Sequence, residues 1–297
     1  MIRKSIYTFA MLLAWVGVML PGAAEAAVTV TVTGTNTARA DFALGGTPAS
    51  PQYTGTVFMT FESPIGLTAA NLNVTAQIVS PSNPALLARL PGGGQVAVPS
   101  GFPVMISINP PASGGFEFIN TAKVELYTTT LSFNAAIPYR LYKAPPGGMF
   151  YDITEDVVAG SIRCRSRTGG FSDFIMVVDS RSLLDIIEDK YAFLEARTGD
   201  DDIDPLTRTA LQLDLDESLE EFLEGDYEDA RTELDDLELR IDTAAGVSIP
   251  NRWLAGGSLD NVAGSLEAEA IALDYALRQL IASSGGGGDD DDHDDDD

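Results

Sequence analysis

The residues with the clearest potential for chemistry are three aspartates in a short polar segment. Asp200, Asp202 and Asp204 have the 1, 3, 5 spacing of a calcium-binding loop, in which carboxylate oxygens are the ligands. The position at which such a loop needs glycine holds Pro205, and the position of its bidentate glutamate holds Leu211, so the segment is not an EF-hand. It predicts a helix start whose carboxylates interact favourably with the helix dipole, with weak calcium binding as the alternative.

A row of arginines is the second candidate, and it is a site for interaction. Arg163, Arg165 and Arg167 alternate with Ile162 and Cys164, so a strand would place the arginines on one face and the other two residues on the opposite face. One hypothesis is that the row docks against acidic residues elsewhere in the chain. The alternative is the ordinary solvent face of an edge strand, where charges discourage pairing with another edge.

Residue counts exclude most catalytic and cofactor chemistry. The chain has one Cys and one His, and His293 is surrounded by eight aspartates. That setting cannot hold an imidazole in the fixed geometry that a nucleophilic triad or a histidine-rich metal centre requires. Cys164 is expected in the interior as an inert residue, with an intermolecular disulfide or a reactive thiol as the alternative. No cofactor and no enzymatic activity are expected, although a carboxylate-based hydrolase remains a third possibility because glycoside hydrolysis needs only two acids.

Charge is distributed unevenly along the 297 residues. The formal net charge is -26, from 44 acidic against 18 basic residues, which argues against nucleic acid as a partner. Residues 27–180 contain 9 acids and 8 bases, whereas residues 181–284 contain 26 acids and 8 bases. Residues 285–297 are four glycines followed by aspartates around His293, which predicts a disordered, solubilising tail that could also attract calcium.

The first 26 residues have the layout of a secretory signal peptide. Arg3 and Lys4 precede an apolar run of about 15 residues, which is shorter than a bilayer crossing requires. Ala24 and Ala26 then fit the small-x-small cleavage rule, so the mature chain is expected to begin at Ala27. The sequence therefore predicts export to the periplasm or the exterior, with no stable membrane insertion after cleavage.

The mature chain changes character near residue 180. Residues 27–180 are rich in Thr, Val, Ile and aromatic residues between Pro/Gly turns, with strict alternation at 28–33, which predicts an antiparallel β-sandwich of Ig-like type. From Ser180 the apolar period becomes helical, and residues 181–284 predict an acidic bundle.

The ends of the predicted helices are marked by capping residues. Asp204 is expected to cap the second helix of the bundle, Gly225 to end that helix, and Ser258 or Asp260 to cap the fourth. The apolar stripes are Leu183, Ile187, Tyr191 and Leu194; Leu211, Leu215, Leu219 and Phe222; Tyr227, Ala230, Leu234, Leu237 and Ile241; and Val262, Leu266, Leu273, Leu277 and Leu280. The fold class expected is α+β in separate segments.

Two stretches resemble parts of known secreted proteins. One resembles the closing strands of secreted bacterial β-sandwich domains, and it consists of Tyr139-Arg140-Leu141-Tyr142-Lys143, Phe150-Tyr151-Asp152-Ile153-Thr154, Gly160 to Arg165 and Gly170-Phe171-Ser172-Asp173-Phe174. The other is similar to helical modules appended to bacterial surface proteins, and it consists of Gly225-Asp226-Tyr227-Glu228-Asp229-Ala230 with Leu234 and Leu237. The whole chain resembles a member of an uncharacterised family of exported bacterial proteins.

The resemblance implies an extracytoplasmic binding or structural role and names no ligand. The sequence as a whole therefore predicts an exported, non-catalytic protein that binds a protein or a glycan. The alternative is a calcium-responsive acidic protein that uses the Asp200–Asp204 segment and the aspartate tail.

Overall fold

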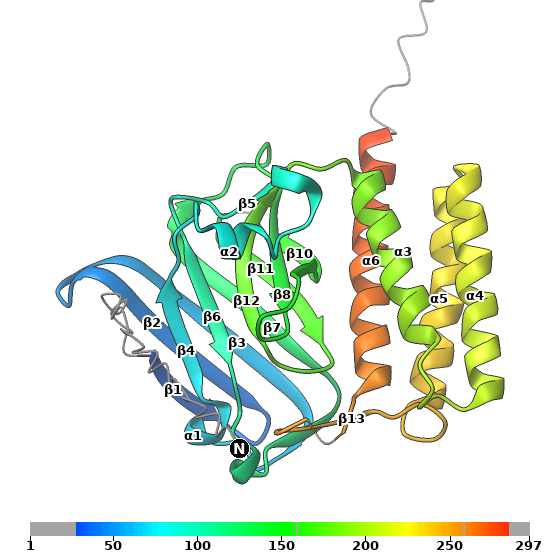
Figure 1. The fold of residues 1–297 in the computed structure, drawn as a ribbon, viewed down its shortest axis with the longest axis horizontal. Helices are drawn as coiled ribbons and strands as arrows, with labels where there is room; N and C mark the ends of the chain where they lie inside the picture. The colour runs from blue at the N-terminus through cyan, green and yellow to red at the C-terminus, as the bar shows by residue number, and fades with distance from the viewer. Residues whose placement is uncertain (1–27, 159, 258, 285–297) are drawn as a thin grey trace, which may run out of the picture.

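The computed structural model describes residues 28–158, 160–257 and 259–284. The expected signal peptide at 1–26 and the Gly/Asp tail at 285–297 lie outside the described residues, and both stay predictions. Figure 1 shows the strands of the first half of the chain beside the helices of the second half, with α3 and α6 next to the strands and α4 and α5 farther away.

Within the described residues the strands form two antiparallel sheets. Sheet A has seven strands in the order β1-β2-β3-β7-β11-β10, with β13 also paired to β7. Sheet B has six strands in the order β4-β6-β12-β8-β9, with β5 paired to β12. The strand bounds are β1 Val28–Thr33, β2 Thr37–Thr47, β3 Ser50–Ile65, β4 Val74–Ile78, β5 Val96–Ala97, β6 Val104–Ile108, β7 Glu117–Ser132, β8 Tyr139–Ala144, β9 Tyr151–Asp152, β10 Thr154–Val158, β11 Ser161–Thr168, β12 Asp173–Asp179 and β13 Arg252–Leu254.

The described chain also contains six α-helices, so the fold is α+β as expected. Single-turn helices α1 and α2 and two short 3₁₀ turns lie between strands, where no helical pattern was predicted. In the described part of the chain no helix combines the length with the apolar character that a membrane crossing needs. The helix bounds are α1 Ala69–Leu72, α2 Pro84–Leu87, α3 Leu183–Thr198, α4 Pro205–Glu224, α5 Tyr227–Ala244 and α6 Val262–Ser284, and the 3₁₀ turns are Gly92–Gly94 and Ala112–Gly114.

The main apolar core lies between the two sheets. Alternating side chains of β3, such as Val57, Met59 and Phe61, meet residues of β6 and β12 in this core. Each fully buried side chain of this size stabilises the fold by about 2 kcal/mol relative to exposure. Val28 to Thr33 show the predicted alternation, since the valines are partly buried and the threonines are exposed.

A second apolar core is shared by α3, α4, α5 and α6. The predicted stripes supply most of it, with Leu219, Tyr227 and Leu280 partly buried at its margin. Leu183 is the exception, because it is half-buried and lies outside this core.

Gly225 ends α4 as predicted, and it adopts a φ of 91° that favours glycine. Asp204 caps the start of α4 as predicted, by accepting hydrogen bonds from the amides of Leu206 and Thr207.

The predicted cap of α6 is wrong. Ser258 lies outside the described residues, and Asp260 forms an ion pair with Arg197. The side chain of Asn261 instead accepts a hydrogen bond from the Gly264 amide at 2.9 Å, and it donates to the Gly169 carbonyl at 3.0 Å. The cap therefore also attaches the start of α6 to sheet A.

Strand β13 brings the helical half back to the sheets. It lies between α5 and α6 in the sequence and pairs antiparallel with Glu117–Ile119 of β7. Trp253 stacks on Phe118 with ring centroids 5.3 Å apart and also contacts the rings of Phe116 and Phe171. The expectation of separate strand and helix segments misses this strand, because three residues are too few to show a period of two.

Two glycines allow α6 to approach sheet A closely. A side-chain carbon at Gly264 would lie 2.0 Å from the Asn120 carbonyl oxygen of β7, and one at Gly169 would lie 2.5 Å from the Ser265 amide nitrogen. Neither backbone atom can move away without breaking its own element, so both positions require glycine.

We expect Gly264→Ala to destabilise the protein by about 2 kcal/mol because the added carbon overpacks the contact with Asn120. This sign is the reverse of the usual one, since alanine in place of glycine stabilises a helix by about 1 kcal/mol. Urea unfolding followed by circular dichroism measures the change, with Ser284→Ala at the exposed end of α6 as the control. A Gly264→Ala variant more stable than the wild type would contradict the close approach.

Candidate functional site

The candidate site lies where α3 and α6 pack against β8, β9 and the end of β12. Every residue of β8 is buried, because one of its faces contributes to the core between the sheets and the other is covered by the loops around α2. The chain passes from β12 into α3 through Ser180–Ser182, and the Ser182 side chain caps α3 by accepting a hydrogen bond from the Asp185 amide. This short connection fixes α3 against the sheet.

Four buried charged side chains meet at this junction, and we call them the junction network: Arg140, Asp152, Lys190 and Glu269. Arg140 Nη1 lies 3.1 Å from an Asp152 carboxylate oxygen, and Lys190 Nζ lies 3.1 Å from Glu269 Oε1. Lys190 Nζ is also 3.6 Å from the Asp152 carboxylate and donates to the Asp152 carbonyl at 2.7 Å. All four side chains are at most 4% exposed.

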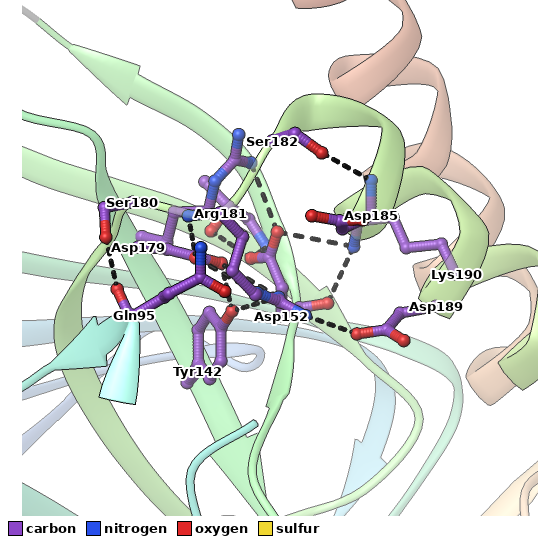
Figure 2. A network of polar contacts seen from close by, with 12 residues as sticks. Gln95, Tyr142, Asp152, Asp179, Ser180, Arg181, Ser182, Asp185, Asp189 and Lys190 are labelled. Atoms are coloured by element: carbon purple, nitrogen blue, oxygen red, sulfur yellow. Dashed lines mark hydrogen bonds and ion pairs between the residues drawn. The ribbon is translucent and has the colours of Figure 1, made fainter. Parts of the chain in front are cut away.

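Secondary structure explains how the network is assembled. Asp152 ends β9, where the amide and hydroxyl of Thr154 both donate to its carboxylate. Lys190 and Glu269 each lie about two turns into their helices, on the sides that face the sheets. Figure 2 shows Lys190 extending from α3 toward Asp152, with dashed lines to the groups that it contacts.

The burial of these charges changes their pKa values. Burial raises the pKa of Glu269 to about 7, even though the Lys190 ammonium opposes the change. Burial also works to raise the pKa of Asp152, but the positive charges of Lys190 and Arg140 outweigh it and lower that pKa. Nearby, burial lowers the pKa of Lys143 to about 8. The junction therefore contains groups that titrate close to neutral pH.

A second polar cluster lies beside the network at the end of β12. Arg181 donates to both carboxylate oxygens of Asp179, to the hydroxyl of Tyr142 and to Asp189 of α3 (Figure 2). Tyr142 in turn donates to Asp179 at 2.5 Å. Burial and the carboxylates of Asp152 and Asp179 raise the pKa of Tyr142, so it remains a neutral hydrogen-bond donor.

A cleft of about 730 Å³ opens beside these two clusters, and we call it the junction cleft. Its polar lining includes Arg140, Arg181 and Gln279, and the start of α3 at Leu183 forms part of its wall. Its apolar lining comes from the β7–β8 loop, β8, β10, α3 and the end of α6: Phe133, Ala135, Ile137, Pro138, Tyr139, Val157, Ile186, Tyr275 and Ala282. A smaller pocket of about 150 Å³ lies nearby, between Asp152, Lys190 and Glu269.

Arg140 is the side chain that connects the network to the cleft. Its Nη1 binds Asp152, its Nη2 donates to Gln279 of α6 at 2.6 Å, and its guanidinium carbon lies 5.8 Å from the centre of the Tyr275 ring. Its Nε is buried and has no hydrogen-bond partner within the described part of the chain. A buried donor without a partner costs about 1 to 3 kcal/mol. Arg167 Nε, Ser172 Oγ and Arg208 Nε are also without a partner in the described chain, but of these residues it is Arg140 that lines the junction cleft.

Comparison with known proteins places the chain in a family. A family of unknown function, DUF6689, matches residues 11–281. The chain belongs to this family. No curated protein and no solved structure matches the chain. The DUF6689 range contains the whole junction network, and it confirms the expectation of a family without an assigned function, while export stays a prediction.

The structure of this DUF6689 protein places the predicted arginine row on the outer face of sheet A. Arg163 and Arg165 form ion pairs with Glu125 of β7, and Arg165 also pairs with Asp156 of β10. Arg167 forms ion pairs with Glu155 of β10 and Glu267 of α6. It is therefore the arginine of the row that pairs with an acidic residue of a helix. The interpretation as an edge strand is wrong, because β11 lies between β7 and β10.

The three predicted aspartates lie in the loop before α4, where Asp200 and Asp204 make different contacts. Asp200 pairs with Arg197 and accepts the Asp202 amide, while Asp204 caps α4. Among the described residues a different acidic group converges, in which oxygens of Glu221, Glu224 and Asp226 lie within 4.8 Å of one another.

Cys164 occupies the core between the sheets, as the alternation predicts. It is fully buried beside Ile162, and burial raises the pKa of its thiol to about 12. The thiol is therefore protonated near neutral pH.

The junction network was not predicted from the sequence, although a signal was present. Lys190 lies three residues after Ile187 and four before Leu194, and Glu269 lies three after Leu266 and four before Leu273. Both charged residues thus occupy apolar stripe positions. A lysine and a glutamate on the buried faces of different helices predict an ion pair between those helices.

The raised pKa of Glu269 predicts a pH-dependent stability. The folded carboxyl keeps its proton up to about pH 7, whereas the unfolded carboxyl loses it near 4.5, so the contribution of Glu269 is present at low pH and is lost as pH rises. Between about pH 4.5 and pH 7, the difference in the free energy of unfolding between the wild type and Glu269→Gln should change in favour of the variant by roughly 1 kcal/mol per pH unit. Urea unfolding at several pH values measures this difference.

The control for this experiment is Glu228→Gln, which changes an exposed carboxyl of α5. Its difference from the wild type should vary little over the same pH range. If the difference in stability between the wild type and Glu269→Gln stayed constant with pH, folding would leave the pKa of Glu269 unchanged, which would contradict the prediction.

Proposed function

We propose that this chain is an exported, non-catalytic binding protein and that its ligand occupies the junction cleft. The observation that carries the proposal is Arg140, a buried side chain that lines the cleft and has a donor without a partner among the described residues. The positions of the other ionisable groups support a non-catalytic role. Asp152, Lys190 and Glu269 are engaged with one another, so they stabilise the junction and have no free carboxylate pair for hydrolysis.

The size and lining of the cleft are those of a small-molecule site. Ligand sites typically have volumes of about 300 to 1,000 Å³, are mostly apolar and lie between structural units. The junction cleft has about 730 Å³, and its walls come from both sheets and from α3 and α6. Aromatic rings of Phe133, Tyr139 and Tyr275 provide apolar surface for the body of a ligand.

The charge of the lining selects an organic anion. The guanidinium groups of Arg140 and Arg181 line the cleft as hydrogen-bond donors, although each is already paired with an aspartate. The start of α3 at Leu183 adds the partial positive charge of a helix N-terminus. Asp179 also lines the cleft, but its carboxylate is fully buried and engaged by Arg181 and Tyr142. A ligand with one carboxylate and an aromatic or aliphatic body therefore fits the cleft best.

We further propose that the two packed sheets form an Ig-like sandwich and that α3 to α6 form an acidic bundle, with the ligand held between them. A protein or glycan partner at the outer face of sheet A remains part of the binding role. That face fits a protein partner better than a glycan. Arg39 lies 5.4 Å from the centre of the Phe58 ring and Arg163 lies 4.8 Å from the centre of the Tyr127 ring. These arginines cover the ring faces on which a sugar would stack.

Benzoate is the first probe for the cleft, and benzylamine is its matched cation. We expect calorimetry on the intact protein to show benzoate binding, and Ala282→Trp to weaken it by about tenfold by filling the cleft. Benzylamine should not bind, because the arginines repel its ammonium group.

The control variant is Thr31→Trp, which adds the same ring to an exposed position of β1. It should leave benzoate binding unchanged. Equal binding of benzoate and benzylamine, or no binding of benzoate, hexanoate and phenyl phosphate, would contradict an organic-anion site in this cleft.

Calcium response is the second candidate function, and the group at Glu221, Glu224 and Asp226 favours it. Desolvation and the neighbouring Glu224 carboxylate raise the pKa of Glu221, and a bound cation would relieve that repulsion. The predicted site at Asp200, Asp202 and Asp204 and the aspartate tail would add weaker binding.

Calorimetry with calcium, on the full chain and on a chain ending at Ser284, tests this candidate. Heat that persists without the tail and disappears in Glu221→Gln would assign the binding to the helical group. The absence of heat in both chains would remove calcium as a ligand.

A further inference from the structure

An apolar groove lies on the helical half, away from the sheets. It has a volume of about 660 Å³ and is formed by the start of α4, the end of α5 and the turn that follows α5. Leu206, Leu239 and Val247 line it and are 84%, 63% and 86% exposed. Ala210 and Ala244 extend the apolar floor between them. We call this surface the helical groove.

Large apolar side chains this exposed rarely cluster without a partner. Leu206 and Val247 contribute nothing to the core of the helices, in contrast to the buried stripes of α4 and α5. These side chains therefore offer an apolar contact surface to another molecule.

The surroundings of the helical groove are negatively charged. Asp236 lines the groove directly, while Arg240, its one basic lining residue in the described chain, is neutralised by a two-pronged contact with Asp214. A second hollow of about 580 Å³ adjoins it, because both are lined by Val247 and Ser248. Asp202 and Asp204 line that second hollow, so the acidic loop before α4 continues the apolar groove.

This charge decides between the occupants of an apolar surface. A second copy of the chain would bring together two helical halves with 26 acidic and 8 basic residues each, and their repulsion opposes association. An anionic lipid surface is repelled for the same reason. A segment with apolar residues on one face and basic residues on the other meets both features at once.

We propose that the helical groove binds a basic amphipathic helix of a partner protein. Apolar side chains of that helix pack on Leu206, Leu239 and Val247, and its lysines or arginines lie over Asp236 and the Asp202 loop. This proposal is independent of the junction cleft, since the two surfaces share no residue.

Three labelled peptides of about four helical turns test the proposal with the intact chain. The first places leucines at positions i, i+3, i+4 and i+7 with lysines between them, so that it forms an amphipathic helix. The second replaces lysine with glutamate, and the third replaces leucine with serine. We expect fluorescence anisotropy to show binding of the leucine–lysine peptide. The double variant Leu206→Ser/Val247→Ser should weaken this binding by about tenfold.

Both substituted side chains are exposed, so the variant keeps the apolar core of the helices intact. The control is Leu223→Ser, which removes an equally exposed leucine near the other end of α4 and should leave binding unchanged.

Three results would overturn the proposal. Equal binding of the serine–lysine peptide would show attraction by charge alone. Binding of the leucine–glutamate peptide would show an unselective apolar surface. A dimer of the wild type that is lost in the double variant would assign the groove to a second copy of the chain.

Discussion

The attachment of the helices to the sheets depends on Lys190, whose buried ammonium group lies between the carboxyl groups of Asp152 and Glu269. Each of these charges is tolerated only while the others stay in place, because an isolated buried charge costs several kcal/mol. A small rotation of α3 would separate them. The network therefore fixes the orientation of α3 and α6, and with it the shape of the cleft that Arg140 lines.

Local patterns in the sequence predicted much of the fold. The alternation of valine and threonine at 28–33 and the stripes through Leu211, Leu234 and Leu273 reflect which face of each element is apolar, and burial follows directly from that. Asp204 and Gly225 were predictable for a similar reason, since a cap and a left-handed residue act on their own neighbours.

The remaining features depend on contacts between distant parts of the chain. Asn261 rather than Asp260 caps α6 because its amide also reaches Gly169, and no local pattern specifies that contact. The candidate site was missed because Lys190 and Glu269 were not singled out, although both occupy apolar stripe positions. Their pairing needs the packing of α3 beside α6, which spacing within one helix does not describe.

The position of β13 in the chain has a consequence for biosynthesis. Trp253 covers Phe116 and Phe118, yet it is separated from them by more than 130 residues that include three complete helices. As the chain leaves the ribosome, β7 is present long before β13 exists to pair with it. Sheet A therefore carries an uncovered aromatic surface throughout the synthesis of α3, α4 and α5, and it reaches its final state only after translation has passed Leu254.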